Sequence, residues 1–364
     1  MKAGIVGLPN VGKSTLFNCL SNAKAQSANF PFCTIEPNVG VVNVPDPRLT
    51  QLSELINPER VVPATVEIVD IAGLVKGASK GEGLGNQFLA NIRETDAILH
   101  VLRCFDNDNI VHVDGGVDPI RDKETIDMEL QLKDLETVEK KLEKVKRAAK
   151  TGNKEAQKEL EILTQIHDTL SRGESVRSMT WSEEEYMSLV KPLQLITDKP
   201  VMYVCNVDEG SAVSGNAYVD KVKAAVQSEN AEVLVLAVGV EADINELEDF
   251  EERKMFLEDL GLEEAGSAKL IRSAYRLLKQ QTYFTAGKKE VRAWTVPIGA
   301  SAPQAAGVIH TDFEHGFIRA EVISFSDYIQ YGSESKVKEA GKMRVEGKAY
   351  TVKDGDVIHF LFNV

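Results

Sequence analysis

The residues best suited to chemistry lie in a short stretch near the N-terminus. Residues 7–15 read Gly-Leu-Pro-Asn-Val-Gly-Lys-Ser-Thr and match the phosphate-binding pattern G-x-x-x-x-G-K-[ST]. The glycines let backbone N–H groups wrap around phosphate oxygens, and the helix that follows adds a positive dipole. In this pattern Lys13 reaches the β- and γ-phosphates, and the Ser14 hydroxyl ligates Mg²⁺. The predicted nucleotide-binding cradle consists of Asn10, Val11, Gly12, Lys13, Ser14 and Thr15.

Two later segments contain residues that usually complete such a site. Thr34 lies in a polar, proline-flanked loop, where a threonine commonly becomes a second Mg²⁺ ligand; the alternative is a simple loop threonine. A β-rich run ends in the pattern D-x-x-G, which places Asp70 at a strand end, where it can hold a Mg²⁺-bound water. Gly73 can donate its backbone N–H to the γ-phosphate. We predict a metal site of Ser14, Thr34 and Asp70, with Gly73 as a catalytic contact.

The residue that would orient the attacking water is not at its usual place. Leu74 occupies the position where Ras-like GTPases carry a glutamine, and leucine has no polar group for this task. His112 lies in the polar loop 106–116, which follows the buried strand expected at 97–105. It is the nearest candidate to position water or stabilise the transition state, and the alternative is a loop histidine without this role.

The next buried strand, 201–205, is followed by a motif that bears on the choice of base. GTPases carry N-K-x-D here, but this chain has Val207 at the lysine position and Glu209 at the aspartate position. A short aspartate accepts the two N–H donors of guanine, whereas adenine presents an acceptor at N1, from which the longer Glu209 can turn away. Asn206 can pair with adenine N6 and N7, as asparagine does on DNA. Each good pair discriminates by about 1–3 kcal/mol, so the motif favours ATP without excluding GTP.

The surrounding pattern predicts a helical insertion in the nucleotide-binding domain. The pattern becomes helical from about Pro119, and a break falls at Gly152-Asn153. Residues at steps of three and four form the expected seam on the two arms: Leu135, Val138, Leu142, Val145 and Ala149 on the first, and Ala156, Leu160, Leu163, His167 and Leu170 on the second. This spacing is typical of an antiparallel coiled-coil hairpin. Its tip concentrates positive charge that can contact phosphates, although a solvated helix surface is the alternative. The basic residues are Lys140, Lys141, Lys144, Lys146, Arg147, Lys150 and Lys154.

The C-terminal part has a different composition and resembles a known module. From Thr282 a strand-helix-strand order ends in the turn 354–356 and a final apolar strand, which is similar to the TGS domain, a ubiquitin-like β-grasp module. Residues 73–85 resemble the second switch of the Obg family. Residues 29–38 and the C-terminal end narrow the resemblance to the YchF/Obg-like ATPase subfamily over nearly the entire chain. The resemblance implies preference for ATP and association with the ribosome.

Together these patterns predict an α/β fold: a P-loop NTPase domain (G-domain) with an inserted antiparallel helical hairpin and a C-terminal TGS domain. The expected boundaries are 1–117 and 196–280 for the nucleotide-binding domain, 118–195 for the insertion and 281–364 for the TGS domain. We expect the ribosome to contact the basic hairpin tip and the TGS domain. Mg²⁺ is the expected cofactor, and Asn10 is a candidate ligand for K⁺.

Composition limits the class of protein. The 364 residues carry a formal net charge of −14, which argues against a general nucleic-acid coat and against specific DNA binding. There is no run of about 18 apolar residues and no signal-peptide pattern, so we expect no membrane association and a cytoplasmic location. The four cysteines show no C-x-x-C spacing, which indicates neither zinc nor disulfides. Cys33, beside Thr34, is a candidate redox-sensitive thiol, with an inert cysteine as the alternative.

Three functions remain open at this stage. The first is a slow Mg²⁺-dependent ATPase that binds the ribosome and acts in translation or stress response. The second is an Obg-type GTPase in ribosome maturation. The third is a binding or regulatory protein whose shape is set by nucleotide and for which hydrolysis is incidental.

Overall fold

The computed structural model describes residues 1–22, 38–71, 84–113, 115–247 and 249–363. The chain divides into two compact units, one of residues 1–40 and 67–270 and the other of residues 41–66 and 271–364. Within the described ranges, no helix is both long enough and apolar enough to cross a membrane.

A six-stranded sheet forms the centre of the first unit, with the order β2-β4-β1-β5-β6-β7. β1 pairs in parallel with both β4 and β5, and the parallel pairing continues through β6 to β7. All residues of β5 and β6 are buried, as expected for parallel strands covered on both faces. The carboxyl ends of parallel strands meet at one edge, where α/β proteins bind ligands. The strands are β1 (Lys2–Val6), β2 (Val39–Asn43), β4 (Thr65–Asp70), β5 (Ala97–Arg103), β6 (Val201–Asn206) and β7 (Val233–Leu236).

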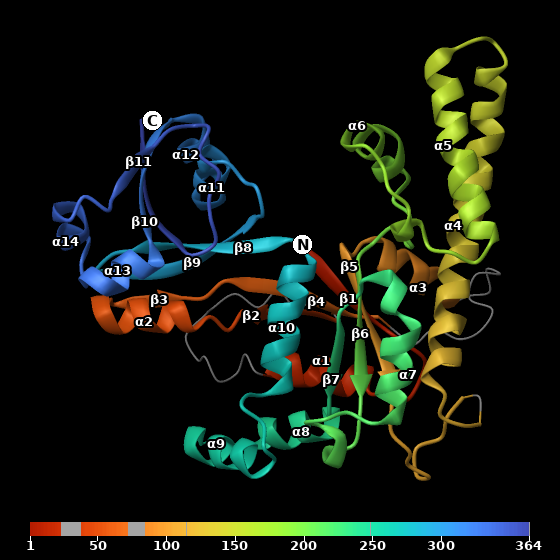
Figure 1. The fold of residues 1–364 in the computed structure, drawn as a ribbon, viewed down its shortest axis with the longest axis horizontal. Helices are drawn as coiled ribbons and strands as arrows, with labels where there is room; N and C mark the ends of the chain where they lie inside the picture. Colours follow the sequence, from red (N-terminus) through yellow and green to blue (C-terminus); the bar gives the residue numbers. More distant parts are fainter. Residues whose placement is uncertain (23–37, 72–83, 114, 248, 364) are drawn as a thin grey trace. The chain divides into compact units, whose positions relative to one another are not determined.

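Helices connect these strands, and the first begins directly at the phosphate-binding loop (Figure 1). α8 and α10 are joined through Glu241, which is 2% exposed and accepts hydrogen bonds from Gly266 N at 2.7 Å and Ser267 N at 3.0 Å. This carboxylate caps the start of α10. The helices are α1 (Lys13–Asn22), α3 (Leu84–Arg93), α7 (Ala217–Ala225), α8 (Val238–Glu246), α9 (Phe250–Asp259) and α10 (Gly266–Leu277).

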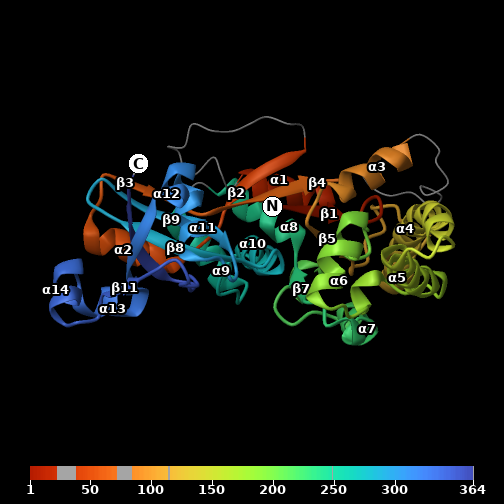
Figure 2. The same cartoon turned by 90° about the horizontal axis from the view of Figure 1, so that it is seen from above.

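The predicted hairpin is present as α4 (Pro119–Ala149) and α5 (Lys154–Ser171), which run side by side in both views (Figure 1, Figure 2). Asn153 caps α5 by accepting a hydrogen bond from Ala156 N, so the predicted break at Gly152-Asn153 is confirmed. The predicted seam on the second arm is partly wrong. Ile166 is fully buried, whereas His167 keeps 33% of its side chain exposed and lies 3.7 Å from Glu139, because the polar ring stays at the edge of the apolar core.

The chain returns from the hairpin through short helical turns, and a buried carboxylate fixes this return. The turns lie at Val176–Ser178, Glu183–Glu185 (α6), Tyr186–Val190 and Lys191–Leu193. Asp134 on α4 is fully buried and accepts hydrogen bonds from Ile196 N at 2.9 Å and from Thr197 N and Oγ1 at 2.7 Å each. Burial raises the pKa of Asp134, and its hydrogen bonds to Thr197 and Ile196 oppose that shift.

The second unit contains another six-stranded sheet, with the order β11-β10-β12-β8-β9-β3. β8 and β9 form an antiparallel hairpin, and β12 lies parallel to β8, which is the β-grasp arrangement expected from the sequence. α11 covers one face over a core that includes Tyr283, Val296 and Ala305. The strands are β3 (Arg60–Val62), β8 (Gln280–Ala286), β9 (Glu290–Pro297), β10 (Phe317–Ser324), β11 (Arg344–Glu346) and β12 (Asp356–Phe362). The helices are α2 (Pro47–Ile56), α11 (Ala302–Ile309), α12 (Thr311–His315), α13 (Phe325–Tyr331) and α14 (Glu334–Glu339).

An early segment of the chain, residues 41–66, groups with this C-terminal unit. β3 pairs in parallel with β9, and the α2 residue Arg48 forms a 2.8 Å ion pair with Asp354. The same guanidinium lies 5.4 Å from the centroid of the Phe284 ring. The sequence placed this segment in the nucleotide-binding domain, because a three-residue strand carries no signal of its distant partner. The three predicted domain boundaries stay a prediction.

The buried carboxylate of Asp134 provides a stability test. Asp134→Ala leaves three donors without their acceptor, so we expect the free energy of unfolding to fall by roughly 3 kcal/mol or more. Urea denaturation followed by circular dichroism measures this change. Glu136→Ala on the same helix is the control, since its carboxylate is 41% exposed and should change stability by less than about 1 kcal/mol. Equal effects of the two variants would contradict the role of Asp134.

Candidate active site

The phosphate-binding loop has a backbone shape that its residues allow. Asn10 and Gly12 have positive φ angles of 62° and 101°. A Cβ atom on Gly12 would lie 2.5 Å from Asn206 Nδ2, so only glycine fits both the backbone conformation and the space. Leu16 N donates to Gly12 O at 2.9 Å, which starts the helical hydrogen-bond pattern of α1 directly after the loop.

Lys13 is the first residue of α1, directly after the loop, and is largely desolvated. It is 6% exposed, and its Nζ donates to Leu8 O at 2.7 Å. Burial lowers its pKa to about 8, and the nearby carboxylate of Asp70 opposes this shift. A desolvated ammonium group with one backbone partner interacts strongly with an anion, so Lys13 is suited to bind phosphate.

Asp70 and Ser14 form the metal side of the predicted site. Burial raises the pKa of Asp70, while a hydrogen bond with Ser14 and the charge of Lys13 act in the opposite direction. Asp70 Oδ1 is buried and has no hydrogen-bond partner in the described part of the chain. A buried carboxylate oxygen without a donor, beside a hydroxyl, fits the oxygen-rich ligation that Mg²⁺ prefers.

Some predicted residues cannot be placed. Thr34, Gly73 and Cys33 lie outside the described residues, so their predicted roles stay predictions. The other three cysteines, Cys19, Cys104 and Cys205, are buried and free.

Asn206 has a structural role that the sequence did not reveal. Its Nδ2 donates to Val11 O at 2.9 Å, and its Oδ1 accepts from Val238 N at 3.0 Å. The side chain is 4% exposed and joins the phosphate-binding loop to the start of α8. Asn206 therefore holds two walls of the site together, and its predicted contact with adenine stays a prediction.

A pocket of about 530 Å³ adjoins the loop and has the size expected for a nucleotide base and sugar. It brings together predicted residues from both ends of the domain and adds two walls that sequence reasoning missed. These walls are the loop after β5, in which the sequence singled out His112 but no pocket residue, and the first turn of α8. Their position at the carboxyl ends of parallel strands was the available signal. The lining residues are Asn10, Gly12, Thr15, Phe105, Asp106, Asn107, Ile110, Asn206, Val207, Asp208, Glu209, Ala237, Val238, Gly239, Val240 and Asp243.

The wall after β5 is shaped by a buried arginine. Arg103 is 2% exposed and donates to three backbone carbonyls, those of Phe105 at 3.2 Å, Ile110 at 2.9 Å and Asn107 at 3.0 Å. These hydrogen bonds satisfy the desolvated guanidinium and fix the loop beside the nucleotide pocket. An arginine at the end of a largely apolar strand was the sequence signal for this role.

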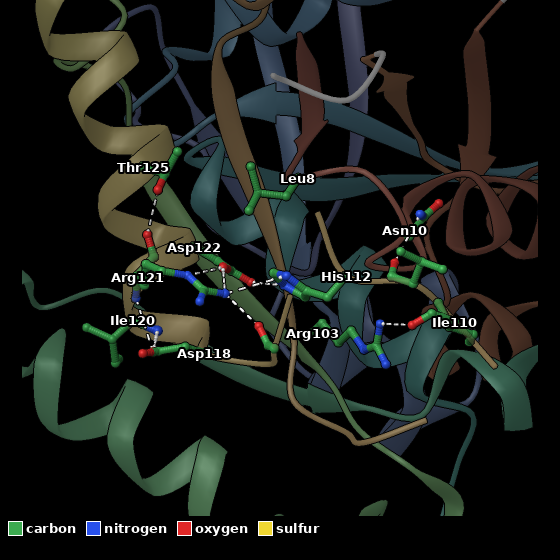
Figure 3. A network of polar contacts seen from close by, with 12 residues as sticks. Leu8, Asn10, Arg103, Ile110, His112, Asp118, Ile120, Arg121, Asp122 and Thr125 are labelled. Atoms are coloured by element: carbon green, nitrogen blue, oxygen red, sulfur yellow. Dashed lines mark hydrogen bonds and ion pairs between the residues drawn. The ribbon is translucent and has the colours of Figure 1, made fainter. Parts of the chain in front are cut away.

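His112 lies further along the same loop, between the phosphate-binding loop and the start of α4 (Figure 3). Asn10 Nδ2 donates to Val111 O at 3.2 Å, which ties the loop to the cradle. His112 Nε2 lies 2.8 Å from Asp122 Oδ2 on α4, and the two side chains are 5% and 1% exposed. The structure thus places His112 directly after Val111, which contacts the cradle residue Asn10. The catalytic role of His112 stays a prediction.

The fold and the site define the class of the protein: a P-loop NTPase with a helical insertion and a C-terminal β-grasp unit. Residues 2–147 match a family model described as a 50S ribosome-binding GTPase. Residues 280–363 match the YchF-GTPase C-terminal model, which is described as a protein of unknown function.

Full-length relatives narrow this class. The ribosome-binding ATPases YchF of Haemophilus ducreyi and Escherichia coli O157:H7 are each 58% identical over 363 residues, covering 100% of this chain and 99% of theirs. The Bacillus subtilis relative is 56% identical over 366 residues and is covered completely. The solved structure of the Schizosaccharomyces pombe YchF GTPase has a TM-score of 0.90 at 39% identity, covering 99% of this chain and 97% of that one. The chain belongs to the YchF family, within the Obg-like superfamily.

The lowered pKa of Lys13 predicts how nucleotide binding depends on pH. Since its pKa in the free protein is about 8, the ammonium form that binds phosphate becomes the minor form at higher pH. We expect ATP affinity to fall about tenfold between pH 7 and pH 9, with proton uptake on binding at the higher pH. Calorimetry in buffers of different ionisation enthalpy measures both quantities.

The control for this measurement is Lys13→Arg. An arginine keeps its charge across this pH range, so the pH dependence should vanish even if the affinity is lower. Wild-type affinity that stays constant from pH 7 to pH 9 would contradict the assignment to Lys13.

Proposed function

We propose that the protein is a Mg²⁺-dependent ATPase that prefers ATP to GTP, binds the ribosome and works in the cytoplasm. The observation that carries the enzymatic part is the pairing of a desolvated Lys13 with Asp70, whose buried Oδ1 has no donor among the described residues. The Lys13 ammonium can bind an anion and the Asp70 carboxylate can bind a cation. A nucleotide with Mg²⁺ supplies both. The name of the full-length relatives supports the ribosome-binding part.

Each site residue has a role in this proposal. Lys13 contacts the β- and γ-phosphates, and Ser14 with Asp70 holds Mg²⁺, which neutralises charge that develops on the phosphate oxygens. Thr34 supplies a second hydroxyl ligand to Mg²⁺, Gly73 donates its N–H to the γ-phosphate, and Asn10 is a candidate K⁺ ligand. Because Leu74 cannot orient water, His112 positions the attacking water or stabilises the transition state. Positioning and electrostatics then provide most of the rate acceleration.

The base pocket supports ATP as the preferred nucleotide. Val207 is 3% exposed and lines the pocket with an apolar side chain where GTPases carry a lysine. Glu209 is exposed on the pocket rim, so its carboxylate has room to turn away from the N1 acceptor of adenine. GTP remains the competing substrate, since the N-terminal family model and the yeast structure carry the word GTPase in their descriptions.

The hairpin tip is the surface we propose for ribosomal RNA. Three of its seven basic residues form ion pairs with neighbouring glutamates: Lys140 with Glu136, Lys141 with Glu159 and Lys146 with Glu143. The other four are exposed and have no ion pair with any described residue, which leaves them available for phosphates. These four, which we call the tip cations, are Lys144, Arg147, Lys150 and Lys154. The TGS-like unit is the second surface proposed for the ribosome.

Substitution in the base motif tests the choice of nucleotide. Wild type should bind ATP more tightly than GTP, and Val207→Lys combined with Glu209→Asp should shift the preference toward GTP by roughly tenfold or more, because an aspartate accepts both guanine donors. Dissociation constants for the two nucleotides, in matched Mg²⁺ and K⁺, measure this shift. Tighter GTP binding by wild type would replace the ATPase proposal with the Obg-type GTPase.

Reversing the charge of the tip cations tests whether the hairpin tip binds the ribosome. Changing Lys144, Arg147 and Lys150 to glutamate should weaken binding to purified ribosomes at least tenfold and reduce its salt dependence, because each cation releases counterions when it meets a phosphate. The control is Lys221→Glu with Lys223→Glu on α7, distant along the chain from the hairpin tip. Sedimentation at several salt concentrations separates the two variants. If the α7 variant lost binding equally, general charge rather than the tip would be responsible.

A further inference from the structure

Both ring nitrogens of His112 face residues of α4 (Figure 3). Nε2 lies 2.8 Å from Asp122 Oδ2, and Nδ1 lies 3.5 Å from an Arg121 guanidinium nitrogen. The side chain is 5% exposed. A histidine that orients or activates water needs a ring nitrogen within hydrogen-bond reach of that water. The arrangement in this structure therefore keeps His112 away from the reaction.

Asp122 and Arg121, the two residues that contact His112, also form a hydrogen bond with each other. Asp122 Oδ1 accepts a hydrogen bond from Arg121 at 3.0 Å, while its Oδ2 faces the imidazole. The same Arg121 nitrogen donates to Gly116 O at 2.6 Å, which fastens the end of the loop to the helix. Because Asp122 is 1% exposed, its contacts are shielded from water and correspondingly strong.

We propose that Asp122 and Arg121 form a latch that keeps His112 docked on α4, and that ATP hydrolysis requires its release. The inference rests on the proposed function, in which His112 acts on the attacking water. Asp122 and Arg121 act through His112 and touch neither nucleotide nor water, so they are positioning residues. The latch predicts slow turnover without ribosomes even though the phosphate-binding groups are in place.

The position of the latch also connects it to the proposed ribosome surface. Asp122 lies in the first turn of α4, and the same continuous helix of 31 residues ends at the hairpin tip. Two of the tip cations, Lys144 and Arg147, lie on this helix, and at about 1.5 Å per residue they are roughly 35 Å from Asp122 along its axis. A ribosome that binds the tip can shift α4 and thereby release His112. Ribosome binding should therefore stimulate hydrolysis through the latch.

The variant Asp122→Asn tests the latch with little change of shape. It replaces a charged acceptor by a neutral one and removes the ion pair with Arg121, so His112 should leave its docked position more often. We expect kcat without ribosomes to rise about three- to tenfold with an unchanged KM for ATP. Arg121→Gln should act in the same direction, and both variants should respond less than wild type to purified ribosomes.

Two further variants separate the latch from a structural effect. Asp118→Asn removes a negative charge from the same helix start while keeping a good N-cap, so its kcat should equal that of wild type. Adding His112→Ala to Asp122→Asn should abolish the gain, because the latch acts only through the imidazole. Thermal unfolding of each variant shows whether the fold is retained.

The outcomes distinguish failure of the latch from failure of the proposed role of His112. A fall in kcat for both Asp122→Asn and Arg121→Gln, with the fold retained, would overturn the latch and make these residues supports of a productive His112. A gain that survives His112→Ala would overturn it as well. If His112→Ala alone left kcat unchanged, the proposed role of His112 would fail, whatever the latch variants did.

Discussion

The site depends on a lysine and a carboxylate that are both removed from water. Lys13 has its pKa lowered by burial and Asp70 has its pKa raised by burial, so each is held in an environment that disfavours its charge. Their mutual attraction offsets part of that cost, and phosphate with a divalent cation would offset more. The glycine cradle and the carboxyl edge of the sheet place these two groups together.

Asn206 shows how the rest of the domain maintains this arrangement. Its amide joins the cradle to the start of α8, and Gly12 leaves only enough space for it. A residue that GTPases use in base recognition is thus also part of the frame that holds the phosphate-binding loop. Base preference then depends on the less constrained neighbours, Val207 and Glu209, which line the same pocket.

The histidine proposed to act in hydrolysis is held by other contacts than the phosphate-binding groups. His112 belongs to a loop that Arg103 shapes at one end and α4 holds at the other. Since α4 is also one arm of the basic hairpin, a single helix contacts the loop that carries His112 and contributes to the surface proposed for RNA. Nucleotide binding and the proposed action of His112 therefore depend on different contacts within one domain.

The sequence by itself determined the class of fold, the phosphate-binding loop Asn10–Thr15, the position of Asp70 at the end of a strand, the hairpin and the β-grasp unit. These features follow from local spacing: a glycine pattern between strand and helix, steps of three and four, and a turn before a final strand. Only the tertiary structure decided that Asn206 braces the cradle, that Arg103 shapes a wall of the pocket, that Asp122 holds His112, and that residues 41–66 group with the C-terminal unit. Each of these depends on contacts between side chains or strands far apart along the chain or across a loop, and local periodicity contains no information about such partners.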